Sequence, residues 1–416
     1  MTMRKLALGL LLALALACAA ARGADAPPDE EALRLADQTR MEEERPRDLK
    51  LQLEAAALSP RPGDDSQRLS FDLRWDGRLS PAWRGVLANR LDWRFAGSPQ
   101  RDHGVNTLKE AYLSREFGVD AMLDLGRVNT RYGVAVGYNP TDFLGAGTVR
   151  SVVSADPDSL RQNRLGNAML RWQQLWDRGS LTAIWSPKLG SWPNPDGASL
   201  DWGASNPRQR LLLAGSYRFA ENLNPQWLLL QEQGRSPQLG FNVSRVLGKA
   251  TVIYLEWAGG RQQTAWRQSL GVSDSAWRNR LAGGLTWTGA NKLSLTLEGQ
   301  QDGAAPDNDE WRALREKPAL YGAYRSGVGA GGGLPTRRAA LLRAYWQDAL
   351  VDNLDLTAMR SFDLVDHSGM NWAEVRYHLG AADLALQWQR FDGAPDSRYG
   401  ASPARRVWQL LVDYFY

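Results

Sequence analysis

Apolar and polar residues alternate with a period of two along most of this chain from about Leu49 onward. In one clear case Leu293, Leu295 and Leu297 alternate with Ser294, Thr296 and Glu298. Successive side chains of a β-strand point to opposite faces of the sheet. The pattern therefore predicts strands that each have one apolar and one polar face.

The alternation divides into eighteen segments separated by turn residues. They are 49–58, 66–76, 83–95, 107–117, 119–127, 165–175, 179–188, 208–219, 226–234, 237–247, 250–258, 277–288, 291–301, 337–348, 354–364, 370–379, 381–391 and 404–416. The even count suits a barrel whose two ends lie on the same side of a membrane. Sixteen strands are the alternative, if one hairpin is misassigned.

The connections between these segments alternate in length. Every second one is short, and the longest of the others are 128–164, 189–207, 259–276, 302–336 and 392–403. A soluble β-sandwich gives the same residue alternation but has no reason to sort its loops in this way. Short periplasmic turns and long outer loops are typical of outer-membrane barrels. We therefore predict an all-β fold over 48–416, a transmembrane antiparallel up-and-down β-barrel with a polar lumen.

The first 23 residues have the pattern of a secretory signal peptide. Arg4 and Lys5 precede an apolar stretch that ends near Cys18, and small residues follow. This stretch is shorter than the roughly 20 residues of a spanning helix. A lipidated Cys18 is the alternative, although Leu16 stands where a small residue is expected. Residues 24–47 are charged and predict a periplasmic extension, whose part 29–47 could dock a periplasmic partner.

The last strand carries a predicted assembly signal. Its apolar face consists of Trp408, Leu410, Val412, Tyr414 and Tyr416. This arrangement resembles the terminal signal of outer-membrane barrel proteins, in which an aromatic last residue is recognised by the assembly machinery. The resemblance implies the bacterial outer membrane, with its lipid and lipopolysaccharide, as the location.

Composition narrows the chemistry. Cys18 is the single cysteine, three histidines are present, and the net charge of +4 predicts no nucleic-acid partner. Of the 50 basic residues, 43 are Arg and 7 are Lys. Arginine suits a polar wall, because its planar guanidinium can pair with two acceptors at once.

The predicted inward faces of the strands carry charges of both signs. They are Asp72, Arg74, Arg84, Arg90, Asp92, Arg94, Glu110, Asp120, Asp124, Arg171, Lys188, Arg210, Arg218, Glu256, Arg278, Arg280, Glu298, Arg343, Glu374 and Arg376. A barrel of about 18 strands is too wide for side chains to fill. We therefore expect a water-filled lumen without a sharp charge filter, and a small arginine excess favours anionic or sugar-like solutes.

The most distinctive stretch runs from 123 to 143. It reads Leu-Asp-Leu-Gly-Arg at 123–127, Tyr-Gly at 132–133 and Tyr-Asn-Pro-Thr-Asp at 138–142. It resembles Gram-negative outer-membrane barrels of the porin and alginate-export type, over about twenty residues. The resemblance implies the barrel class and does not identify a substrate. Asn139, Pro140 and Asp142 predict a turn, because Pro fixes φ and the two polar side chains can bond nearby amides.

We predict that the loop 128–164 folds into the lumen and narrows the pore, with 302–336 as the second candidate. A structured external loop is the alternative for this stretch. The residues predicted to line the pore or its constriction are Arg127, Arg131, Asp142, Arg150, Asp120, Asp124, Arg84, Arg90, Arg94, Arg171, Arg278 and Arg280. Asp120 and Asp124 are expected to pair with Arg127 and Arg131.

Catalytic interpretations find little support. His103 and His367 lie in predicted loops and His378 lies beside a short turn, so each is expected to be a solvated or hydrogen-bonded histidine. The glycine-rich segment 327–333 predicts a flexible loop, because no Gly-Lys-Ser/Thr follows it. We expect no enzyme activity, no metal and no cofactor. The predicted function is a passive channel for small hydrophilic solutes. The main alternative is a barrel that exports polysaccharide or lipid, and a structural or adhesive barrel is a third.

Overall fold

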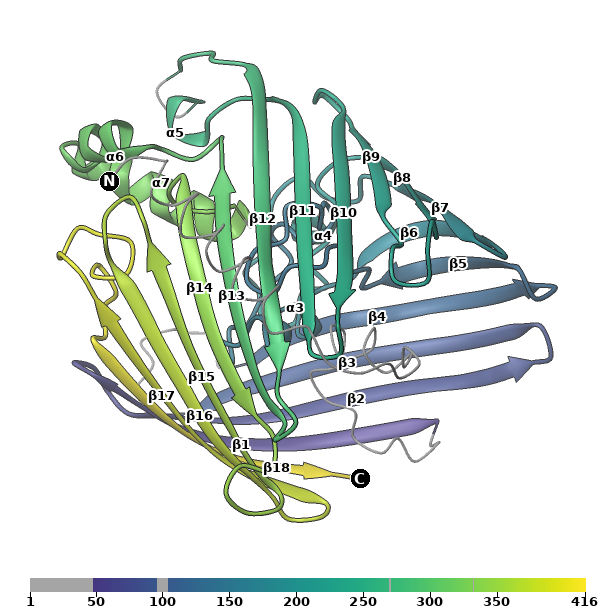
Figure 1. Ribbon diagram of the computed structural model, residues 1–416, viewed down its shortest axis with the longest axis horizontal. Helices are drawn as coiled ribbons and strands as arrows, with labels where there is room; N and C mark the ends of the chain where they lie inside the picture. The colour runs from purple at the N-terminus through teal and green to yellow at the C-terminus, as the bar shows by residue number, and fades with distance from the viewer. Residues whose placement is uncertain (1–47, 96–103, 269–270, 332) are drawn as a thin grey trace.

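The computed structural model describes residues 48–95, 104–268, 271–331 and 333–416. The predicted signal peptide and the extension 24–47 lie outside the described residues, as does His103. The described chain forms one ring of antiparallel strands, and the helices α5 (Ala265–Gln268), α6 (Asn308–Arg315) and α7 (Pro318–Gly331) lie near one end of this ring (Figure 1).

Eighteen strands are found in the described residues. The first nine are β1 (Leu49–Arg61), β2 (Ser66–Ser80), β3 (Trp83–Phe95), β4 (Gly104–Phe117), β5 (Ala121–Val128), β6 (Asn167–Trp176), β7 (Gly179–Ser186), β8 (Arg210–Tyr217) and β9 (Gln226–Glu232). The others are β10 (Gln238–Leu247), β11 (Thr251–Gln262), β12 (Ala276–Thr288), β13 (Leu293–Asp302), β14 (Arg338–Trp346), β15 (Leu354–Asp363), β16 (Gly369–His378), β17 (Ala382–Asp392) and β18 (Arg406–Phe415). Each pairs with its neighbours in the sequence, and β18 pairs with β1. The predicted closed barrel of eighteen strands is confirmed.

The barrel closes through β1 and β18. Leu53 faces Tyr414 and Ala55 faces Val412 across this seam. Beyond the last strand, the backbones of Leu51 and Tyr416 exchange two hydrogen bonds of 3.2 and 2.9 Å. No edge strand is left at this seam, because closure pairs the backbone groups of the first and last strands.

The outer surface of the barrel is apolar. Leucine, valine and aromatic side chains that alternate with buried polar residues point outward, among them Leu113, Leu125 and Leu297, which are 44, 59 and 42 % exposed. Exposed aromatic rings lie near both rims, such as Trp176 beside a short turn and Trp185 beside the long connection that follows β7. Such an apolar band between aromatic girdles is the surface that a transmembrane barrel presents to lipid. Among the described residues, no helix is long and apolar enough to cross a membrane.

Charged residues on the inner wall pair across neighbouring strands. Glu54 on β1 accepts hydrogen bonds from Arg68 on β2 at 2.5 Å and from Arg90 on β3 at 2.8 Å. Arg90 also contacts Asp92 at 2.9 Å. All four side chains are buried. A buried charge without a partner is costly. Because positive and negative side chains are interspersed on the inner wall, they can form ion pairs between neighbouring strands.

The long loops carry the helices. They are α3 (Pro157–Gln162), α4 (Trp202–Ser205), α5 (Ala265–Gln268), α6 (Asn308–Arg315) and α7 (Pro318–Gly331). Asp307 caps α6 and forms a capping box with Glu310. The Trp311 ring of α6 packs edge-on against Tyr321 of α7 with ring centroids 5.5 Å apart. The prediction of a flexible loop over 327–333 is wrong as far as Gly331, because α7 continues to that residue and packs against α6.

Candidate functional site: a loop held inside the barrel

The connection between β5 and β6, residues 129–166, contacts the inner wall far from its own strands. Ser151 meets Arg94 on β3 at 3.5 Å, and the carbonyl of Val153 accepts a bond of 3.2 Å from Gln409 on β18. On another side of the ring, Asp156 lies 3.5 Å from Arg343 of β14. A segment that reaches β3, β14 and β18 lies within the ring of strands. We call residues 129–166 the inner loop.

Glu256 on β11 binds the first half of the inner loop. It is fully buried. One carboxylate oxygen accepts backbone N–H bonds from Val134 at 3.0 Å and Ala135 at 3.2 Å. The other accepts the backbone N–H and the hydroxyl of Thr141, each at 2.7 Å. A carboxylate surrounded by backbone donors is satisfied without a neighbouring cation.

Glu298 on β13 binds the next residues of the same segment. Its oxygens accept backbone N–H bonds from Val136 at 2.7 Å, from Gly137 at 3.1 Å and from Tyr138 at 3.0 Å. The Tyr254 hydroxyl donates to it at 2.8 Å. The N–H groups of five consecutive residues, 134–138, are therefore divided between two carboxylates. We call Glu256 and Glu298 the carboxylate clamp.

Two glycines allow the loop to approach the clamp. At Gly133 the backbone φ is +103°, and a Cβ atom would lie 2.6 Å from a carboxylate oxygen of Glu256. At Gly137 a Cβ would lie 2.7 Å from side-chain atoms of Gln300 and of Leu341. The Tyr-Gly pair noted in the sequence thus has a steric reason. The predicted Asn-Pro-Thr-Asp turn is confirmed, since Asp142 N bonds the Asn139 carbonyl at 3.2 Å.

Apolar contacts support the clamp. Ala135 and Tyr138 of the inner loop pack with Tyr254, Ala282 and Ala339 of the wall in one buried cluster. These wall residues occupy inward positions, where the other strands carry charge. Apolar residues at inward positions indicate that an apolar segment packs against them inside the lumen. The sequence-based prediction did not use this observation. The roles of Glu256 and Glu298 were also missed, although both were predicted to face inward.

Arg127 stands at the root of the inner loop. Its guanidinium donates to the carbonyl of Leu200 at 2.8 Å and to the hydroxyl of Ser205 at 3.2 Å, and lies 3.9 Å from the ring centroid of Trp202. The side chain is 2 % exposed. It therefore holds the end of β5, from which the inner loop starts, against the β7–β8 loop, which carries α4.

Arg150 makes a second connection to the β7–β8 loop. It donates to the backbone carbonyls of Ser199, of Asp196 at 2.6 Å and of Asn106 at 2.7 Å. Burial lowers the pKa of Arg150, and Asp201 partly offsets this effect. Two loops thus lie together inside the barrel, whereas the sequence pointed to one.

Asp142 pairs within the inner loop. Arg164 donates to its two oxygens at 2.6 and 3.2 Å and also donates to the carbonyl of Thr130 at 2.8 Å. Arg164 thus joins the end of the inner loop to its beginning at Thr130 and to the turn at 139–142. The Arg131 side chain is exposed. Desolvation first, and then the positive charges of Arg164 and Arg161, lower the pKa of Arg131.

The predicted partners of Arg127 and Arg131 are wrong. Asp120 lies in the short turn between β4 and β5 and is exposed. Asp124 pairs instead with Arg171 on β6 at 2.7 Å. Two neighbouring strands place Asp124 and Arg171 directly opposite each other, so the wall satisfies this carboxylate.

The other arginines predicted to line the pore are engaged by the wall or by loops. Arg84 pairs with Asp76, and Arg280 donates to Gln238 at 2.7 Å and lies over the Phe143 ring of the inner loop. Arg278 pairs with Asp274 in the β11–β12 loop at 2.7 Å. Arg90 and Arg94 have the contacts given above.

The barrel wall also carries a histidine that is bound to carboxylates. His378 lies between two carboxylates, with Nδ1 2.7 Å from Asp383 and Nε2 3.3 Å from Asp355. No cluster of three His, Cys, Asp or Glu side chains suited to a metal ion is found among the described residues.

Comparison with known proteins relates the fold to solved structures. No family model matches the chain, and no curated protein matches it. Acinetobacter baumannii OccAB1 is similar with a TM-score of 0.56 and 10 % identity over 88 % of this chain and 95 % of that one. Pseudomonas aeruginosa OccK8 (OprE) is similar with a TM-score of 0.54 and 12 % identity over 88 % of this chain and 97 % of that one. At such identity the likeness concerns the fold, and the resemblance to the alginate-export type stays a prediction.

Proposed function

We propose that this chain is an outer-membrane channel for the passive passage of small hydrophilic solutes, and that the inner loop forms its constriction. The proposal rests above all on the carboxylate clamp. Two buried glutamates hold the backbone of 134–141 on wall strands six and eight places beyond β5. A loop fixed in this way occupies part of the lumen and reduces the cross-section that is open to solutes.

The polar interior supports passage of water-soluble molecules. An eighteen-stranded wall is too wide to be filled by its own side chains, and its inner charges are largely paired. Arg131 adds an exposed positive charge on the inner loop, near Arg161 and Arg164. We infer a mild preference for anionic solutes and no strong charge filter.

The solved barrels of similar fold are outer-membrane porins, which supports a channel rather than an enzyme. We infer that His378 has a structural role, because its ring is shared by two carboxylates on neighbouring strands. The apolar belt and aromatic rims fit residence in the outer membrane.

The test is single-channel conductance of the purified, refolded chain in planar bilayers. The wild type is expected to conduct in small, uniform steps. A variant in which a short Gly-Ser linker replaces 130–164 is expected to conduct severalfold more, because the lumen is then wider. A matched control replaces the short β9–β10 connection, 233–237, with the same linker and is expected to conduct like the wild type.

Two results would contradict the proposal. Absence of conductance in both the wild type and the variant without the inner loop would exclude a pore. Equal conductance of these two proteins would leave a pore but remove the inner loop as its constriction.

A further inference from the structure

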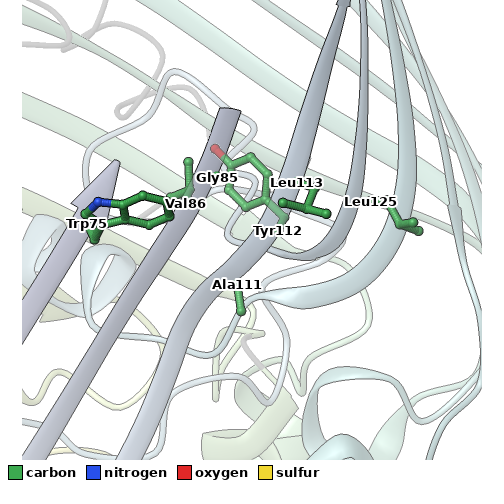
Figure 2. A pocket seen from close by; sticks show the side chains of 7 residues that line it. All are labelled: Trp75, Gly85, Val86, Ala111, Tyr112, Leu113 and Leu125. Atoms are coloured by element: carbon green, nitrogen blue, oxygen red, sulfur yellow. The ribbon is translucent and has the colours of Figure 1, made fainter. Parts of the chain in front are cut away.

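A shallow groove interrupts the lipid-facing side of the barrel at β2–β5. Trp75, Gly85, Val86, Ala111, Tyr112, Leu113 and Leu125 line it, and its volume is about 280 Å³. Figure 2 shows Trp75 at one edge of the groove and Leu125 at the other. Leu113 and Leu125 face each other across β4 and β5 and are 44 and 59 % exposed. They alternate with buried Ser114 and Asp124, so the groove opens outward.

The groove exists because small residues stand where the belt elsewhere carries leucines. The Trp75 indole lies against Gly77 and Gly85, and a Cβ atom on Gly85 would be 2.7 Å from this ring. Ala111 continues the depression on β4. A larger side chain at position 85 or 111 would fill it.

A cation lies at the end of the groove nearest the short turns. Arg115 follows Leu113 on the same face of β4 and is opposite Trp83 of β3. Its guanidinium carbon lies 5.3 Å from the Trp83 ring centroid and 4.9 Å from that of Phe117. Within the described residues no carboxylate is paired with it. An exposed arginine that stacks on two rings at a membrane rim can bind an anion through its planar guanidinium.

We propose that this wall binds one glycerophospholipid of the periplasmic leaflet. The phosphodiester would pair with Arg115, and an acyl chain would lie along Leu113 and Leu125. The polarity of the site matches this ligand: the charge is at the rim and the groove runs from it toward the middle of the bilayer. Arginine can pair with two phosphate oxygens at once. This proposal does not depend on whether the barrel conducts.

The acyl chain gains little from leaving bulk lipid, because lipid tails are as apolar as leucine. Retention must therefore come from close packing in the groove together with the phosphate pairing. Removing the phosphate pairing and filling the groove should therefore each weaken lipid retention independently.

Native mass spectrometry of the full chain in detergent tests the proposal, with dioleoyl-phosphatidylglycerol titrated as the probe. The wild type is expected to retain one lipid. Arg115→Gln should weaken retention at least tenfold by removing the charge, and Gly85→Leu should do so by filling the groove. Ala111→Leu serves as a second filling variant if Gly85→Leu does not give the heat-modifiable band of a folded barrel on a gel.

The chain supplies matched controls on a distant part of the wall. Arg245 is an exposed arginine near the same rim on β10, and Gly215 is a glycine of β8 with nothing closer than 3.8 Å to an added Cβ. Arg245→Gln and Gly215→Leu are expected to retain the lipid like the wild type. Millimolar inorganic phosphate should not displace it, because phosphate has no chain for the groove.

Three outcomes would overturn the proposal. Equal lipid retention by the wild type, Arg115→Gln and a folded filling variant would show that the groove is not the site. Displacement by inorganic phosphate would reduce it to an anion site. A dimer that Gly85→Leu dissociates would assign the groove to a second copy of the chain.

Discussion

The carboxylate of Glu298 accepts a hydrogen bond from the backbone nitrogen of Val136 at 2.7 Å, across a sequence separation of 162 residues. The bond joins β13 to a loop that leaves the wall at β5. The position of the inner loop is therefore fixed by strands that fold around it. The loop and the closed wall stabilise each other.

Neutralising the carboxylate clamp should release the inner loop. Glu256→Gln with Glu298→Gln keeps the shape of both side chains but turns charge-assisted hydrogen bonds, worth about 1.5–3 kcal/mol each, into neutral ones. The amide nitrogens would also face N–H donors. We expect higher and noisier single-channel conductance, together with new protease cleavage within 134–142.

Glu110→Gln provides the control for the clamp variant. Glu110 also faces inward, but its partner is Arg74 on β2 at 2.5 Å. Conductance and cleavage should stay at the wild-type level. If the double clamp variant behaved in the same way as this control, the clamp would not hold the loop.

Gly133→Ala should loosen the inner loop, as the double clamp variant should. The added methyl group would stand 2.6 Å from Glu256, and the φ of +103° is strained for alanine. Strained backbone alone costs about 1–3 kcal/mol. Single-channel recording should show a wider, less uniform pore.

Gly118→Ala separates strain from the steric clash. Gly118 has a φ of +69° and nothing within 4 Å of an added Cβ. Its short turn lies away from the inner loop, so pore width should not change. A wider pore in this control would indicate a general loss of barrel stability instead.

Arg131→Gln and Asp142→Asn should have different effects. Asp142→Asn leaves the buried Arg164 without its charge partner, which typically costs about 3–5 kcal/mol, and should loosen the loop. Arg131 is exposed, so Arg131→Gln should reduce the preference for anions and leave pore width unchanged. Reversal potentials in a salt gradient measure the preference. A wider pore in Arg131→Gln and none in Asp142→Asn would contradict the assignment.

Alanine in place of exposed glycines of α7 should stabilise the helix pair α6 and α7. A Cβ at Gly322 or Gly327 meets nothing within 4 Å, and glycine in a helix is less stable than alanine by about 0.5–1 kcal/mol. Amide hydrogen exchange over 308–331 should slow in Gly322→Ala and Gly327→Ala. Faster exchange would mean that α7 needs the freedom of its glycines.

The barrel could be predicted because its information is local. The outward orientation of Leu293, Leu295 and Leu297 follows from their alternation with polar residues. The lengths of the connections distinguish the two rims of the barrel. The predicted strand boundaries differ from the observed ones where polar residues continue a strand. β1 extends to Arg61, beyond the predicted 58, because its partner β18 continues to Arg406.

The inner site could be predicted only in part, since its contacts join distant segments. The turn at Asn139 was predicted from local residues, whereas the need for a glycine at position 133 was not. The pairing of Asp124 was misassigned, because Arg171 lies 47 residues away and becomes its neighbour only through strand pairing. The partners of Glu256 are mainly backbone N–H groups. Almost every residue type has such a group, so the residue types of the sequence do not identify these partners.

The last residue offers a test of the predicted assembly signal that is independent of the pore. The backbone of Tyr416 bonds Leu51 across the closing seam, and its side chain is 67 % exposed on the same outward face as Tyr414. Tyr416→Ala keeps the two backbone bonds and removes only the ring. If the ring is a recognition element for the assembly machinery, the amount of protein in the outer membrane should fall, while refolding in detergent should proceed as in the wild type. Tyr377→Ala removes another outward tyrosine near the short-turn rim, on β16, and should reduce neither quantity. Equal membrane levels of Tyr416→Ala and Tyr377→Ala would remove the terminal ring from the assembly signal and leave it only a packing role.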